Sequence, residues 1–198
     1  GLRGVGKTVL LNEFGEIARG ERWEVLELEA SKHDDTRFRQ TMASLFKAAL
    51  LRLSPRAKWT DHARRAAAVV TSFAVSVDQQ GTWSLAWDVA PEDGFADHND
   101  LSLDLTDVLV AIGELAKERE RGVAILIDEV QFLSTRQLEA LIQAVHKTVQ
   151  RKLPVTFVGA GLPQIAKLAG DAKSYAERLF QFPKIDSLDE AEASEALR

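Results

Sequence analysis

The sequence contains no cysteine among its 198 residues. Disulfide bonds and thiolate metal sites are therefore excluded, because both need cysteine sulfur. Long apolar runs are missing too, since no stretch holds the roughly eighteen consecutive apolar residues that a membrane-spanning helix needs. No basic start followed by an apolar segment indicates a secretory signal. Together these absences predict a soluble protein of the cytoplasm with no membrane partner.

Positive charge is in the minority, because 25 Lys and Arg stand against 30 Asp and Glu, for a formal net charge of -5. A domain that binds nucleic acid over a broad surface needs a net positive charge. We therefore expect any DNA contact to come from a flanking domain that is missing from this sequence. With 45% hydrophobic and 28% charged residues, the composition is otherwise that of a globular protein.

Apolar periodicity divides most of the chain into alternating helices and strands. Helical spacing predicts helices over 7–19, 36–53, 103–119, 135–150, 162–169 and 173–179. Short apolar or alternating runs predict strands over 23–28, 123–127, 154–158 and 182–185. Strands that alternate with helices are typical of a parallel sheet covered on both faces, so we predict a three-layer α/β/α fold.

A different pattern follows the second helix. Two runs of alternating apolar residues flank Asp78-Gln79-Gln80-Gly81, which predicts an inserted β-hairpin over 71–89. One face of this hairpin would gather Phe73, Val75, Val77, Trp83, Leu85 and Trp87. That face either covers the core of the domain or forms a docking surface for a protein partner.

The first eight residues, GLRGVGKT, match the phosphate-binding pattern G-x-x-x-x-G-K-[ST] directly before a predicted helix. Glycines allow the backbone to curl around a phosphate with its N–H groups pointing inward, and the helix start favours the same anion. Lys7 would bridge the β- and γ-phosphates of ATP as a catalytic cation, and Thr8 would offer its hydroxyl to Mg²⁺. We expect cofactor contacts from Gly1, Arg3, Gly4, Val5, Gly6, Lys7, Thr8 and Val9.

An acidic pair, Asp128 and Glu129, ends the apolar strand that begins at Val123. The carboxyl end of a parallel strand is where such sheets place ligand-binding residues. We expect Asp128 to hold Mg²⁺, and Glu129 to act as the catalytic base that accepts a proton from the attacking water. Because the guanine-reading motif N-K-x-D is absent from the sequence, ATP is favoured over GTP.

These two motifs and their spacing resemble those of P-loop NTPases of the AAA+ class, in particular a bacterial and archaeal branch similar to origin-recognition initiator and signal-transduction ATPases. The resemblance implies that Arg178 is an arginine finger that reaches the γ-phosphate of a neighbouring subunit in a homo-oligomer. An exposed arginine on an amphipathic helix remains the alternative. Gln131 resembles a polar residue that orients water or couples nucleotide state to a partner, so we expect it among the cofactor contacts as well, and a surface glutamine is its alternative.

Two departures from the AAA+ pattern qualify this interpretation. A polar sensor residue is expected after the strand at 154–158, but Gly159-Ala160-Gly161 stands there, which predicts slow hydrolysis. The first strand of the fold is expected before Gly1 and is missing. We therefore assign 1–187 to the AAA+ core and 188–198 to the start of a truncated lid or following helical domain.

The sequence is consistent with two functions. One is an ATP-driven switch or motor, acting as part of a larger protein, that hydrolyses its nucleotide. The other is a regulatory module that binds ATP, hydrolyses little of it, and whose output is the binding of a protein or DNA partner.

Overall fold

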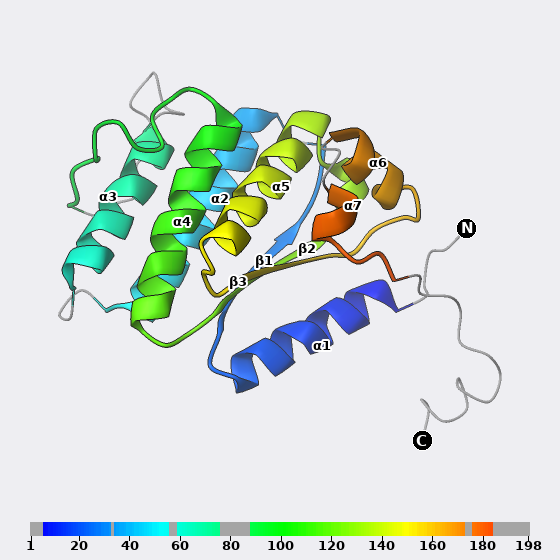
Figure 1. Cartoon of the computed structure of the whole chain (residues 1–198), viewed down its shortest axis with the longest axis horizontal. Helices are drawn as coiled ribbons and strands as arrows, with labels where there is room; N and C mark the ends of the chain where they lie inside the picture. Colours follow the sequence, from blue (N-terminus) through cyan, green and yellow to red (C-terminus); the bar gives the residue numbers. More distant parts are fainter. Residues whose placement is uncertain (1–5, 33, 56–58, 76–87, 173–175, 184–198) are drawn as a thin grey trace.

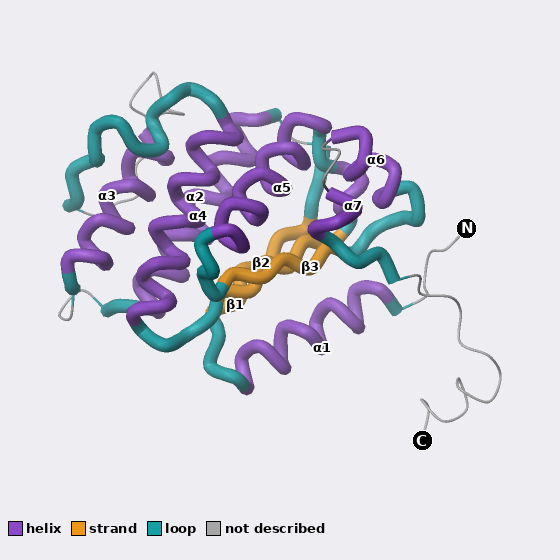
Figure 2. The backbone as a smooth tube through the Cα atoms, viewed as in Figure 1, coloured by secondary structure: helices purple, strands orange, loops and turns teal. Residues whose placement is uncertain are grey.

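A computed structural model of the chain describes residues 6–32, 34–55, 59–75, 88–172 and 176–183. Its centre is a parallel sheet in which β2 lies between β1 and β3 (Figure 2). The three strands are β1 (Glu24–Glu29), β2 (Val123–Asp128) and β3 (Val155–Gly159). All of β2 except its last residue is buried, because helices cover both faces of the central strand.

Helices form a layer on each side of this sheet (Figure 1). One face carries α1 (Lys7–Gly20). The opposite face carries α2 (Asp35–Leu53), α4 (Leu101–Glu118) and α5 (Thr135–Gln150). The remaining α-helices of the described ranges are α3 (Asp61–Val75), which packs against α2 and α4, and α6 (Ile165–Ala172) and α7 (Ala176–Leu179), which pack against each other. A short 3-10 helix, η2 (Val130–Phe132), follows β2. The predicted α/β class with a parallel sheet is confirmed.

The helices begin where side chains can satisfy their free backbone N–H groups. Asp34 accepts a hydrogen bond from the backbone N–H of Arg37 at 2.8 Å, and Asp100 caps α4 in the same way. Ser134 and Gln137 form a reciprocal capping box at the start of α5. Because α2 follows β1 and α5 follows β2, the caps at Asp34 and Ser134 place the starts of these two helices at the carboxyl edge of the sheet.

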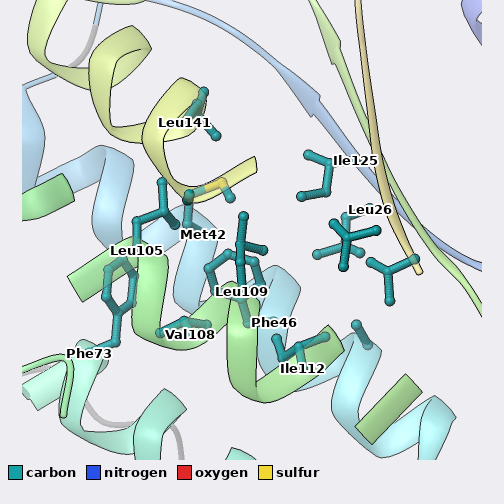
Figure 3. Close-up of a cluster of buried hydrophobic side chains, with 14 of the residues drawn as sticks. Leu26, Met42, Phe46, Phe73, Leu105, Val108, Leu109, Ile112, Ile125 and Leu141 are labelled. Carbon is teal, nitrogen blue, oxygen red and sulfur yellow. The ribbon is translucent and has the colours of Figure 1, made fainter. Parts of the chain in front are cut away.

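The core lies between β2 and the layer of α2, α4 and α5 (Figure 3). Phe46 of α2 and Phe73 of α3 are both fully buried and meet edge to face, with ring centroids 6.0 Å apart. Other fully buried members are Met42, Leu105, Leu109, Ile112 and Ile125. This packing holds β2 rigidly, so the residues at its carboxyl end start from a fixed position.

The loop before α4 is fastened by a buried charge pair. Arg39 lies 2.7 Å from the Asp104 carboxylate, which is fully buried, and its guanidinium also lies over the Phe73 ring. The backbone N–H of His98 donates to the other oxygen of Asp104. A hydrogen bond with Asp107 raises the pKa of the His98 ring above its ordinary value.

The predicted hairpin over 71–89 is wrong at its start, because residues 71–75 are the last turn of α3. Every residue from Val69 to Ala74 is buried, so the alternation of apolar and small polar residues does not mark an exposed face. The hydroxyls of Thr71 and Ser72 donate to backbone carbonyls four residues earlier, which lets a buried helix contain them. Residues 76–87, with both tryptophans of the expected docking surface, lie outside the described ranges.

The expected strand at 182–185 is not formed where the chain is described, since Phe182 and Pro183 lie in a loop. Aromatic contacts hold this segment instead. The Phe180 ring meets the Phe157 ring of β3 at 5.7 Å and the Phe182 ring at 6.4 Å. Residues 184–198, including the predicted helical start at 188–198, lie outside the described ranges.

Helix α1 buries little of its surface. Leu11 and Gly15 are buried, whereas Leu10, Phe14 and Ile17 are 39%, 42% and 57% exposed. Leu11 packs with apolar side chains of β2, which is enough to fix the start of the helix against the strand. Across the described ranges, no helix combines the length and the apolar character needed to cross a membrane.

Candidate functional site

The candidate site lies where the start of α1 meets the carboxyl end of β2. The hydroxyl of Thr8 donates a hydrogen bond to Oδ2 of Asp128 at 2.6 Å, although the two residues are 120 positions apart in the sequence. Gly6 caps α1 with φ of 81°, a left-handed conformation that favours glycine. Thr8, the last residue of the phosphate-binding pattern, therefore lies in contact with the first residue of the acidic pair.

The Asp128 carboxylate is held by both of its oxygens. Oδ2 accepts from Thr8, and Oδ1 accepts from the backbone N–H of Glu129 at 2.8 Å. On the neighbouring strand, Glu29 pairs in register with Asp128, so both lie at the same edge of the sheet. Glu29 has no signal in the sequence beyond its place as the last acidic residue of β1.

Glu129 adopts a left-handed backbone conformation, with φ of 53°. Such a conformation costs a residue other than glycine about 1–3 kcal/mol and persists only where neighbouring contacts enforce it. Here the contacts include the Asp128 carboxylate on the backbone N–H and the N–H of Phe132 on the backbone carbonyl. The side chain is held too, because the Gln131 amide donates to it. Glu129 thus leaves the strand in a direction fixed by its surroundings.

The segment after β3 lies beside this acidic pair. A Cβ on Gly159 would come within 2.8 Å of a Val130 methyl, and one on Gly161 within 2.8 Å of Oε1 of Gln131. The same Gln131 oxygen accepts a hydrogen bond from the backbone N–H of Leu162 at 3.1 Å. A side chain at Gly159 would therefore collide with Val130, whereas a side chain at Gly161 would displace the amide oxygen of Gln131.

Comparison with protein-family models assigns the chain to a family. The family model for the AAA ATPase domain matches residues 1–158, which include both motifs and the strand that ends in the acidic pair. The chain belongs to the AAA ATPase domain family. Searches of the curated proteins and of the solved structures gave no match. A nucleotide-binding ATPase is the activity that this family membership supports.

The other predicted site residues of this AAA ATPase domain differ in their exposure, and some lie outside the described ranges. Lys7 is half-buried in the first turn of α1, and Val9, the residue directly after Thr8, is 72% exposed. Arg178 is exposed on α7 and has no ion-pair or hydrogen-bond partner within the described ranges. The remaining predicted contacts, Gly1, Arg3, Gly4 and Val5, lie outside those ranges.

The oxygen atoms of Thr8 and Asp128 are the ligand type that Mg²⁺ prefers. In the part of the chain that the structure describes, no group of three or more acidic or histidine side chains could hold a metal ion by itself. Magnesium commonly binds through one or two carboxylates together with phosphate oxygens and water. The donor set of this AAA ATPase domain fits that arrangement, in which a nucleotide supplies the missing ligands.

Proposed function

We propose that this AAA ATPase domain binds ATP with Mg²⁺ at the junction of α1 and β2, hydrolyses it, and serves as a nucleotide-driven switch or motor in a larger protein. The contact between Thr8 and Asp128 carries the proposal. It joins the end of the phosphate-loop pattern to the acidic strand end, the two parts that phosphoryl-transfer sites of this kind need together.

Binding would rest on groups at the start of α1. The ammonium group of Lys7 would offset the charge of the β- and γ-phosphates, and the free backbone N–H groups of the first turn would face the same anion. Thr8 and Asp128 would hold Mg²⁺, which when bound neutralises charge on the phosphates. These side chains come from a helix and a strand that pack together, so their separation is set by the fold.

Hydrolysis would depend on Glu129. Its carboxylate would take a proton from the attacking water as the water oxygen forms a bond to the γ-phosphorus and the bond to the bridging oxygen breaks. The products are ADP and inorganic phosphate. The fixed backbone of Glu129 and its half-buried position support this role, because a general base must be held in place.

A regulatory module that binds ATP and rarely hydrolyses it is the second candidate. One observation favours it, namely that Gly159-Ala160-Gly161 stands where a polar sensor of the γ-phosphate is expected, and a side chain at Gly159 would collide with a Val130 methyl. The resemblance to origin-recognition initiator and signal-transduction ATPases agrees with either role, since both kinds of protein use nucleotide state to control partners.

Nucleotide binding and phosphate release measured on the same sample test the proposal. We expect ATP with Mg²⁺ to bind and to be turned over repeatedly, with phosphate released in excess over protein. Stoichiometric binding without release would favour the regulatory module. If ATP does not bind in the presence of Mg²⁺, both candidate functions are wrong.

A further inference from the structure

Gln131 connects two parts of the site through the two ends of its amide group. Its Nε2–H group donates to Oε2 of Glu129, and its Oε1 accepts from the backbone N–H of Leu162 at 3.1 Å. We infer that Gln131 is a positioning residue, which holds the Glu129 carboxylate and makes its position depend on the loop that follows β3. This inference rests on the proposed function, because it assigns a control to the proposed base.

The loop after β3 is joined to the segment after β2 by successive hydrogen bonds. The N–H of Ala160 donates to the carbonyl of Ile127 at 2.8 Å, and the N–H of Val130 donates to the carbonyl of Ala160 at 2.9 Å. The bond from Leu162 to Gln131 continues this series one step further. A shift of the loop would therefore move the Gln131 amide and the carboxylate that it holds.

Gly161 provides a second observation. A Cβ at this position would lie 2.8 Å from Oε1 of Gln131 and farther from any other atom, so the amide oxygen fills the space of the absent side chain. Glycine at 161 thus allows the bridge. It also explains how a domain without a polar side chain at the end of β3 can still connect that loop to the acidic pair.

The bridge needs an amide at residue 131, because one end must donate and the other must accept. A glutamate of the same length would keep an acceptor for Leu162 but would present a second carboxylate to Glu129. Like charges at hydrogen-bond distance repel, so this substitution would displace the base and leave the loop contact possible. The two contributions of Gln131 can therefore be separated by experiment.

Turnover of the Gln131→Glu variant is the first test. We expect kcat to fall about 10²-fold, the usual cost of misplacing a catalytic group by about 1 Å, with an unchanged Kd for ATP. The matched control is Gln150→Glu on the exposed end of α5, which should keep the wild-type kcat. Wild-type turnover in Gln131→Glu would mean that Gln131 only anchors the loop, and the inference would be overturned.

Gly161→Ala is the second variant, since its methyl group would push Oε1 of Gln131 without removing any polar group. We expect kcat to fall here too, with the Kd for ATP unchanged. A variant with wild-type kcat would contradict the inference, because the loop would then have no influence on the base.

A measurement that needs no hydrolysis separates this inference from the proposed function. The side-chain amide NMR signals of Gln131 should move in Glu129→Gln and stay in place in Glu120→Gln, whose side chain is exposed at the opposite end of the sheet. Unmoved signals in Glu129→Gln would overturn the bridge. If the wild type does not turn over ATP but these signals move, hydrolysis and the catalytic role of the bridge are refuted. The contact between Gln131 and Glu129 is then still established.

Discussion

Replacing Glu129 with glutamine is expected to lower ATP turnover by about 10²- to 10⁴-fold, the usual contribution of a general base. Glutamine has nearly the same shape but cannot accept the proton from the attacking water. The Kd for ATP should change little, because Thr8 and Asp128 still meet and Lys7 is untouched. Steady-state phosphate release and equilibrium binding, measured on the same preparation, report the two quantities separately.

Glu120→Gln is a suitable control, since Glu120 is also an acidic residue with a left-handed backbone but lies before β2, at the other end of the strand. Its turnover should equal that of the wild type. Unchanged turnover in Glu129→Gln would remove Glu129 from the mechanism. A loss of ATP affinity as large as the loss of turnover would make Glu129 a binding residue instead.

Replacing Arg178 with alanine is expected to lower turnover by about 10³- to 10⁵-fold if the domain works as an oligomer, the range known for arginine fingers. Arg178 is exposed on α7, while its neighbour Ala176 is fully buried and fastens the helix. An anchored helix that presents an exposed cation suits a group offered to an adjacent subunit. Turnover measured over a range of protein concentrations checks this expectation.

A mixing experiment decides whether Arg178 acts on a neighbouring subunit. Arg178→Ala keeps its own Glu129, and Glu129→Gln keeps its own Arg178, so a mixture of the two inactive variants should recover part of the turnover. Lys167→Ala on the exposed surface of α6 is the control and should remain active alone. Full activity of Arg178→Ala alone would leave Arg178 as an ordinary exposed arginine.

Elements with strong local signals were predicted from the sequence almost to the residue. The helix from Thr135 to Gln150 has the predicted bounds, because Ser134 and Gln137 form a capping box and the apolar period is regular. The buried strand at 123–127 was recognisable as a continuous apolar run between polar residues. Both predictions depend on interactions within a few residues.

The prediction for residues 71–75 is wrong because burial on several sides removes the helical periodicity of apolar residues. In α3 the residues around Phe73 are buried on several sides by α2, α4 and the loop at Glu92, so the pattern did not show a helical face.

The candidate site was also predicted only in part. Asp128 and Glu129 were found from their strand, but the bridge from Gln131 to Leu162 joins the short 3-10 helix after β2 to the loop after β3, and the pairing of β2 with β3 sets their approach.

The affinity for ATP with and without Mg²⁺, measured in the wild type and in Asp128→Asn, shows whether Asp128 and Thr8 form the metal site for the nucleotide. Mg²⁺ should tighten ATP binding by the wild type, and the substitution should weaken this Mg²⁺-dependent binding by at least about 10- to 100-fold, the cost of losing even a residue that only supports the ligands of a metal site. Asp171→Asn, on the exposed surface of α6, should behave as the wild type. An Asp128→Asn variant that responds to Mg²⁺ as strongly as the wild type would contradict the account.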